Sequence, residues 1–263
     1  MEYAVSKPLL SALLLSTLAI ACANDAELSY GGSARRVAGS NAVRMLRERV
    51  VMDVTRMTTK VHCDFWFRND GALATIKMGF PDEGTNTEEF QPGAKPASNF
   101  AYFKSWVEGR PVATRFSQGE DRTFWHVKTV RFPHGVTHVR DEYAMDTGYG
   151  IMEAARKTGN CSWTRYTVHT GSTWKGAIGE TVIVVRFSKK EFSRGIKLLS
   201  PAPVDGEVNG RDLRGQVFPS KNSVVCKGVS RPRVSGTTLT FRRTNWRPAE
   251  KDDLNIWFGY RHG

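Results

Sequence analysis

The feature that most constrains the fold of this chain is a two-residue alternation of apolar and polar side chains. In the range 59–69, the residues Val61, Cys63, Phe65 and Phe67 share one phase of this alternation. Successive side chains of a β-strand point to opposite faces, so the pattern predicts a strand with one buried face. Because Cys63 shares the phase of the apolar residues, we expect it to be a small buried hydrophobe.

The same alternation recurs along most of the chain. It predicts further strands at 72–80, 100–107, 111–116, 123–132, 136–143, 163–170, 180–187, 222–227, 236–243 and 254–260. Turn residues separate these segments, and Glu108-Gly109 is typical of a tight hairpin. Only 42–49 and 151–157 have the pattern of short helices. The sequence therefore predicts a mainly β protein built as an antiparallel β-sandwich with few short helices.

A chain of 263 residues can form one elongated β domain or two closely packed β units. The segment 188–222 is richer in proline, glycine and charge than its surroundings, which indicates long loops or a weak boundary. We therefore expect a main β-sandwich over 24–187. The range 188–263 is expected to be a C-terminal β region with long loops, packed on the first.

The N-terminus has the layout of a secretory signal peptide. Lys7 precedes an apolar run at 8–20, and small residues follow it at Ala21, Cys22 and Ala23. The run is too short for a membrane-spanning helix of about 20 residues. We expect cleavage after Ala23, with residues 1–23 removed and the protein secreted or periplasmic. The alternative is a lipid-anchored envelope scaffold that begins at Cys22.

Cleavage after Ala23 leaves Cys63, Cys161 and Cys226 in an oxidising compartment. An odd number of cysteines permits at most one internal disulfide. Since Cys63 is expected in the core, Cys161 and Cys226 form the candidate pair.

The chain is basic, with 38 Lys and Arg against 26 Asp and Glu and a formal net charge of +12. The excess lies in the two flanks of the sequence and is rich in arginine, whose forked guanidinium suits phosphate or carboxylate groups. An exported protein would meet an anionic envelope polymer or a membrane surface rather than nucleic acid. The alternative is that these arginines have acidic neighbours in space and serve only solubility. The candidate residues are Arg35, Arg36, Arg44, Arg47, Arg49, Arg56, Arg231, Arg233, Arg242, Arg243 and Arg247.

Signals for catalysis and for metal binding are weak. The chain has no Gly-x-Ser-x-Gly, His-Glu-x-x-His or catalytic-cysteine signature. His134 and His138 are zinc-ligand types with Asp141 and Glu142 close by, but in a strand the two histidines lie about 13 Å apart. The acidic residues of 82–89 do not have the spacing of a calcium-binding EF-hand loop. We therefore expect no metal and no cofactor, and we favour a binding or structural protein over an enzyme.

Tryptophans give an alternative function, because stacked indoles suit the apolar faces of sugar rings. A carbohydrate-directed enzyme or module would use surface tryptophans in this way. Two of them lie in turn-rich surroundings that favour a structural role instead. We expect these structural corners at Gly171, Trp174 and Gly176, and at Asn245, Trp246 and Pro248.

Several short motifs occur together in one order along the chain: Asn24-Asp25-Ala26, Tyr30-Gly31-Gly32, Phe67-Arg68-Asn69, Phe80-Pro81, Trp106 to Val112, Tyr166 to Gly179, Thr244 to Pro248 and Asp253 to Ile256. This order resembles a family of secreted bacterial proteins of unknown function. The resemblance covers most of the chain after residue 23, whereas 188–235 matches nothing in the family. It implies a signal peptide and a β-rich fold, and it transfers no catalytic residue.

Overall fold

A computed structural model describes residues 31–32, 35–38, 42–82, 97–118, 124–150, 160–199 and 222–260. In these ranges nearly all regular structure is β, and the only helices are two short 3₁₀ turns, η2 (His169–Thr173) and η3 (Glu250–Asp252). None of the helices in the described ranges is long and apolar enough to cross a membrane. The predicted mainly β fold is confirmed. The predicted helix at 151–157 lies outside the described residues.

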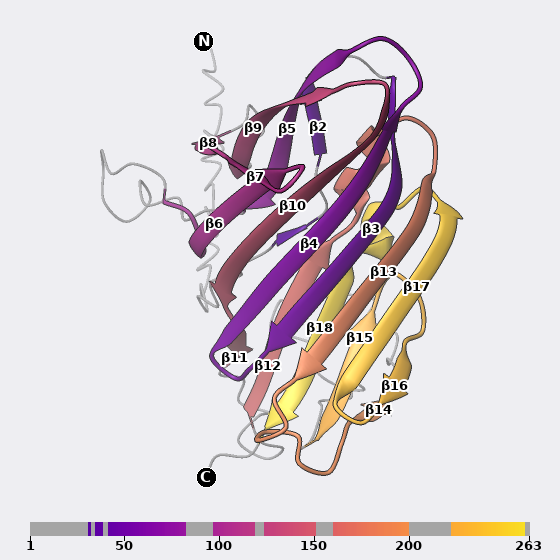
Figure 1. Cartoon of the computed structure of the whole chain (residues 1–263). Helices are drawn as coiled ribbons and strands as arrows, with labels where there is room; N and C mark the ends of the chain where they lie inside the picture. Colours follow the sequence, from indigo (N-terminus) through magenta and orange to yellow (C-terminus); the bar gives the residue numbers. More distant parts are fainter. Residues whose placement is uncertain are drawn as a thin grey trace, which may run out of the picture.

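The larger layer is an eight-stranded sheet that crosses the whole molecule (Figure 1). Its only parallel pair is β3 with β13, and the other neighbours run antiparallel. The predicted hairpin at Glu108-Gly109 joins two of its strands, and both residues take the left-handed φ values, 50° and 73°, that such turns need. The strand order is β16 (Arg233–Ser235), β17 (Thr238–Trp246), β13 (Ile178–Phe187), β3 (Val43–Val54), β4 (Thr58–Asn69), β10 (Gly135–Asp146), β6 (Phe100–Val107) and β7 (Arg110–Val112).

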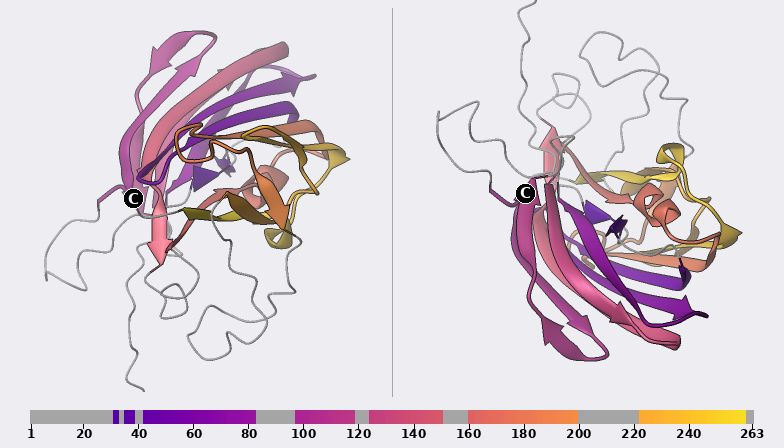
Figure 2. Two further views of the ribbon diagram at one scale, coloured as in Figure 1. Left: turned by 90° about the horizontal axis from the view of Figure 1, so that it is seen from below. Right: turned by 90° about the horizontal axis from the view of Figure 1, so that it is seen from above.

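Two smaller sheets form the second layer, and the larger sheet curves around them (Figure 2). The four-stranded sheet has the order β2 (Arg35–Ala38), β5 (Ala74–Asp82), β9 (Phe124–Phe132) and β8 (Arg115–Gln118). The six-stranded sheet has the order β1 (Gly31–Gly32), β12 (Asn160–Thr167), β18 (Leu254–Tyr260), β15 (Ser223–Lys227) and β14 (Lys197–Leu199), with β11 (Gly148–Gly150) also paired to β12.

Aromatic side chains fill the space between the layers. Phe80 of the four-stranded sheet lies 5.1 Å, between ring centroids, from Tyr143 of the larger sheet. Phe187 of the larger sheet lies 5.2 Å from Phe258 of the six-stranded sheet. All four residues are buried, so both small sheets share one continuous core with the large one.

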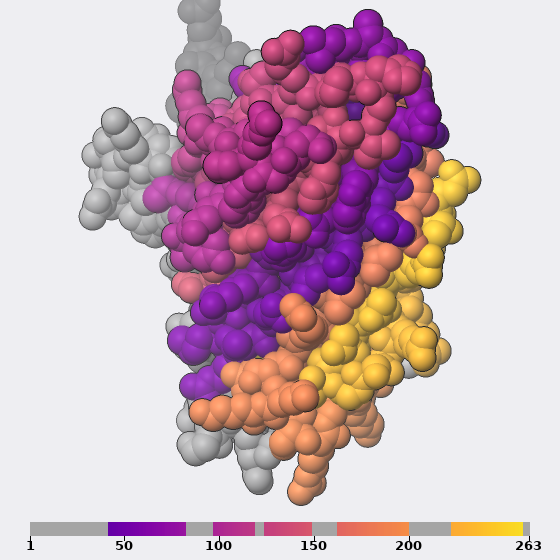
Figure 3. Space-filling view, in the orientation of Figure 1, coloured from indigo at the N-terminus to yellow at the C-terminus, as the bar shows by residue number. Residues whose placement is uncertain are grey.

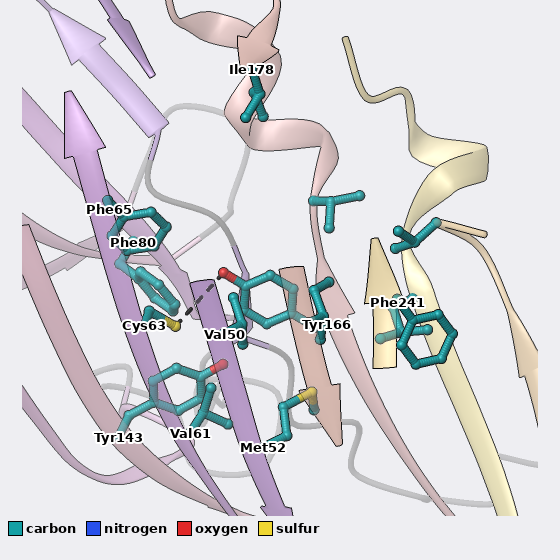
Figure 4. Packing of buried hydrophobic residues seen from close by; sticks show 14 of the residues in the cluster. Val50, Met52, Val61, Cys63, Phe65, Phe80, Tyr143, Tyr166, Ile178 and Phe241 are labelled. Atoms are coloured by element: carbon teal, nitrogen blue, oxygen red, sulfur yellow. Dashed lines mark hydrogen bonds between the residues drawn. The ribbon is translucent and has the colours of Figure 1, made fainter. Parts of the chain in front are cut away.

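Polar groups also join the layers inside this core. The Tyr166 hydroxyl of β12 donates to Glu48 Oε1 at 2.9 Å and lies 3.7 Å from Cys63 Sγ (Figure 4). Lys128 of β9 forms a buried ion pair with Asp141 of β10. Cys63 is fully buried, as its strand phase predicts, and burial raises the pKa of its thiol well above the usual value. One tyrosine thus ties the six-stranded sheet, and one lysine the four-stranded sheet, to the large sheet.

The predicted helix at 42–49 is wrong, because this segment is the first half of β3. A register shift between Met45 and Arg47 places a bulge at Leu46 in the pairing with β4. The extra residue breaks the two-residue alternation, and the apolar residues Val43, Leu46 and Val50 then have nearly helical spacing.

Residues 222–260 do not form a separate layer. β17 pairs with β13 in the eight-stranded sheet, while β15 and β18 belong to the six-stranded sheet with β12. Strands from both sides of the expected boundary near residue 188 are therefore hydrogen-bonded into the same two sheets.

The predicted disulfide between Cys161 and Cys226 is wrong. Cys161 pairs with Gly259 on one side of β18, and Cys226 pairs with Ile256 on the other side. Two strand spacings of about 4.8 Å separate β12 from β15, which exceeds the reach of about 7 Å between the Cα atoms of a disulfide. Cys226 is accordingly a free thiol.

Trp174 lies in the core. Its side chain is 1% exposed and packs on Phe67 at 4.4 Å and on Phe132 at 6.0 Å between ring centroids. Gly176 follows with a φ of +70°, which a residue with a Cβ adopts only with strain. Gly171 instead lies within η2, where its backbone N–H donates to the carbonyl of Val168 at 3.0 Å. The chain turns here through a 3₁₀ helix rather than through a left-handed glycine at 171.

Trp246 marks a second corner, at the end of β17. Its side chain is 6% exposed, and its indole Nε1 donates to Thr181 Oγ1 at 3.0 Å. Asn245 has a φ of 48°, in the left-handed region that asparagine tolerates, and Pro248 is buried beyond it.

We expect Trp174→Ala to lower the free energy of unfolding by about 3–5 kcal/mol, because it leaves a cavity between two phenylalanine rings. Denaturant titration measures this loss. Trp257→Ala is the matched control, since Trp257 is only partly buried on the outer face of β18, and its effect should be clearly smaller. Equal losses in the two variants would contradict the assignment of Trp174 to the core.

Candidate binding face

The solvent-facing side of the eight-stranded sheet carries a group of aromatic and charged side chains that contact one another. The strand alternation turns every second residue of β3, β4, β10 and β6 outward, on the face seen in Figure 3. We call these residues the outer patch: Arg47, His62, Asp64, Trp66, Tyr102, Lys104, Trp106, His138, Arg140 and Glu142.

Asp64 is the centre of the polar part of the outer patch. Its carboxylate accepts hydrogen bonds from His138 Nε2 at 2.8 Å and from Arg140 Nε at 3.0 Å. His62 Nε2 lies 3.6 Å from the same carboxylate, and His62 Nδ1 lies 2.9 Å from Glu142 Oε1. The network crosses β4 and β10 and fixes side chains that would otherwise move freely.

The protonation of Asp64 follows from these contacts. Its side chain is 8% exposed, and burial alone would raise its pKa. The hydrogen bonds from Arg140 and His138 outweigh burial and hold the pKa below the usual value of 3.8. Asp64 is therefore ionised throughout the neutral range.

Trp66 is a rigid anchor in the outer patch. The His138 ring stacks on its indole at 4.9 Å between centroids with an interplanar angle of 21°. From the neighbouring strand, the Arg47 guanidinium lies 5.6 Å from the indole centroid and donates to Glu180 at 2.8 Å. The strand register places Arg47 and His138 on opposite sides of Trp66, so these two side chains cover the two faces of its indole ring.

The accessible rings are those of β6. Trp106 lies opposite Arg140 of β10 and is partly exposed. Tyr102 is 39% exposed, and Lys104 Nζ lies 5.5 Å from its ring centroid. Tyr102, Lys104 and Trp106 share one face of the strand, so two aromatic rings flank a cation along about 13 Å of β6.

The predicted arginines are divided among several surfaces. β3 brings Arg47 and Arg49 near Arg242 of β17, with β13 between them. Glu180 of β13 binds both Arg47, at 2.8 Å, and Arg242, at 2.5 Å. In this part of the surface the arginines alternate with acidic side chains.

Of the remaining arginines, Arg233 of β16 lies opposite Thr240 and is therefore a diagonal neighbour of Arg242 on the same face of the sheet, whereas the others have different neighbours. Arg44 lies 3.9 Å from Asp70. Arg243 lies over the Trp246 ring at 5.1 Å, and Arg247 donates to the carbonyl of Ser172 at 3.1 Å. Arg35 and Arg36 belong to β2 of the four-stranded sheet, Arg56 to the turn after β3, Arg231 to the stretch before β16 and Arg233 to β16.

The potential zinc ligands in the range 134–142 do not all lie on the same face of β10. His138 and Glu142 point outward, whereas Asp141 points inward and pairs with Lys128. No group of three potential ligands converges within the described residues.

Sequence analysis did not identify a cluster of Asp82, Ser98 and His126, in which Asp82 and His126 are buried and Ser98 is partly buried. Ser98 Oγ donates to Asp82 Oδ2 at 2.5 Å, and His126 Nε2 lies 2.9 Å from that oxygen and 3.2 Å from Ser98 Oγ. A catalytic triad needs serine and aspartate on different ring nitrogens. Here both contact Nε2, so the cluster does not have the geometry of a nucleophile and its base. Only the inward phase of Asp82 on β5 and of His126 on β9 hinted at it.

No protein-family model matches the chain, and no curated protein matches it. Among solved structures, a candidate nutrient binding protein from Legionella pneumophila is similar in fold. It has a TM-score of 0.56 and 15% identity, over 87% of this chain and 71% of that chain. An M1 zinc metallopeptidase from Deinococcus radiodurans gives a TM-score of 0.36 at 10% identity, and this chain spans 42% of its length. Leukotriene A4 hydrolase from Saccharomyces cerevisiae gives 0.42 at 7% identity, over 30% of its length.

We expect Asp64→Asn to lower the free energy of unfolding by about 1–2 kcal/mol at neutral pH, because it weakens two charge-assisted hydrogen bonds. The folded-state pKa of Asp64 is lowered, so its contribution is present above the unfolded value and is lost as pH falls through the folded value. The free energies of unfolding of the two proteins should therefore converge once the pH falls below the folded-state pKa of Asp64.

Asp53→Asn is the matched control for this prediction. Asp53 pairs with Arg186 at 2.7 Å, but both side chains are more than half exposed. The change in the free energy of unfolding should therefore be close to zero. A difference between wild type and Asp64→Asn that stays constant with pH would rule out the ionised network as its source.

Proposed function

We propose that the protein is an exported, non-catalytic binding protein that holds a saccharide on the outer patch. The observation that carries this proposal is the row Tyr102, Lys104 and Trp106 on β6, next to the fixed ion-pair network of β4 and β10. Aromatic faces bind the apolar side of a sugar ring, and the surrounding charged groups bind its hydroxyls. The fold likeness to a candidate nutrient binding protein is compatible with a binding role.

The rigidity of the outer patch supports binding rather than mere solubility. Asp64, His138 and Arg140 already hold one another, and Trp66 is fixed between Arg47 and His138. A ligand that meets fixed side chains does not pay for ordering them, so weak stacking contacts suffice for measurable affinity. The strands themselves are paired on both sides over the centre of the patch, which adds to this rigidity.

Trp106→Ala should weaken binding to the preferred glycan by about tenfold or more, because it removes a stacking ring. A panel of neutral and acidic polysaccharides, followed by calorimetry on the best glycan, measures this. Trp257→Ala serves as the control, since this partly buried tryptophan lies on the six-stranded sheet. The proposal fails if no glycan in the panel binds, or if both variants lose the same affinity.

We further propose that export involves cleavage after Ala23. Intact-mass measurement of the protein expressed with its full N-terminus in a bacterial host should give a chain that begins at Asn24. A mass that retains Cys22 with acyl chains would replace this proposal with a lipid anchor. A chain with an intact N-terminus in the cytoplasm would overturn export itself.

A further inference from the structure

A second surface, on the opposite layer from the outer patch, has a different electrostatic character. It is a groove of about 780 Å³ along the solvent-facing side of the four-stranded sheet. Residues 112–114, which lead from β7 to β8, form one wall, and the outward residues of β5, β9 and β8 line the rest. The groove is large enough for a segment of an extended polymer.

Two exposed cations, Lys77 and Arg115, line this groove, and a third, Arg131, lies beside it on β9. Thr129 of β9 is exposed and lies opposite Lys77 of β5. Arg131 is two residues further along β9, and Arg115 of β8 pairs with Val127, diagonally across from Thr129. Strand spacing and rise place the Cα atoms of all three cations within about 8 Å of that of Thr129.

Within the described residues these cations have no acidic partners. The side chains of Lys77, Arg115 and Arg131 are exposed and form no ion pair or hydrogen bond in those ranges. No carboxylate points outward from β5, β8 or β9 within the same ranges. Arg47 and Arg140 of the outer patch, by contrast, each bind a carboxylate.

Hydroxyl groups complete the lining of the groove. Thr114, Ser117 and Thr129 all border it, and hydroxyls donate to the oxygens of phosphate or carboxylate. Lys128 also borders the groove, but its ammonium is buried and paired with Asp141 on the other side of β9. The free positive charge of the groove therefore comes from the outward residues alone.

We propose that this groove binds an anionic group, a phosphate or a carboxylate, carried on an extended polymer. A concave surface lined by one sign of charge concentrates its field, and arginine and lysine side chains that have no partner among the described residues keep their donors for a ligand. The anion sits over Thr129, between Lys77, Arg115 and Arg131. The cations of this site lie on the four-stranded sheet, whereas the rings of the saccharide face lie on β6 of the eight-stranded sheet; of the larger sheet, only Val112 of β7 borders the groove.

The charge comparison uses three proteins: wild type, the groove variant Lys77→Gln/Arg115→Gln, and the control Lys189→Gln/Lys190→Gln. Both variants lose two positive charges, and the control residues are exposed in the turn after β13. The probes are a glycerol-phosphate oligomer and a galacturonate oligomer of equal length, titrated at several salt concentrations. A neutral glucan of the same length reports on the outer patch alone.

We expect wild type and control to bind at least one anionic oligomer with equal affinity. The groove variant should bind about tenfold or more weakly, and its salt slope should fall by about two, one for each cation removed. Thr129→Val, which changes no charge, should also weaken binding. The oligomer that binds distinguishes phosphate from carboxylate. The proposal is overturned if neither oligomer binds at low salt, or if the groove variant and the control lose equal affinity.

Discussion

The eight-stranded sheet depends on the double pairing of β3 at its centre. One edge of β3 is antiparallel to β4, and the other is parallel to β13, so β13, β17 and β16 reach the rest of the sheet only through β3. Its inward residues Val43, Met52 and Val54 are buried against the second layer. A sheet this wide and curved exposes more apolar surface than one small sheet covers. Two small sheets therefore share its inner face.

Those two sheets are held by different chemistry. Apolar side chains, many of them phenylalanine rings, fill the space between the layers, whereas Tyr166 links the six-stranded sheet, and Lys128 and the Asn69–Phe132 hydrogen bond link the four-stranded sheet, to the large sheet by polar contacts. A buried ion pair adds little net stability, but removing one partner leaves an uncompensated charge in the core. The Lys128–Asp141 pair thus penalises any alternative packing of the four-stranded sheet more strongly than it stabilises the native one.

The sequence predicted local structure better than it predicted contacts. The phase of β4 identified Cys63 as buried, and the glycine after Glu108 identified the hairpin of β6 and β7. The first half of β3 was not predicted as a strand, because the extra residue of the bulge at Leu46 shifts the two-residue alternation that identifies a strand. Alternation does not show which strands are neighbours. The sequence therefore could not show that β18 lies between the strands of Cys161 and Cys226 and keeps these cysteines apart. Lys77 and Arg115 line the same groove only because their strands, β5 and β8, pair with opposite edges of β9.

The position of β18 has a consequence for the order in which the chain folds. This strand, near the end of the sequence, lies between β12 and β15 and pairs with both. Until β18 pairs with both neighbours, the strands of the six-stranded sheet are not joined into one sheet. Before then, the edges of β12 and β15 that will pair with β18 have no partner strand. During synthesis, most of the chain emerges before this sheet can close. The six-stranded layer, and the part of the core that lies beneath it, can therefore be completed only after nearly all of the described strands have been synthesised.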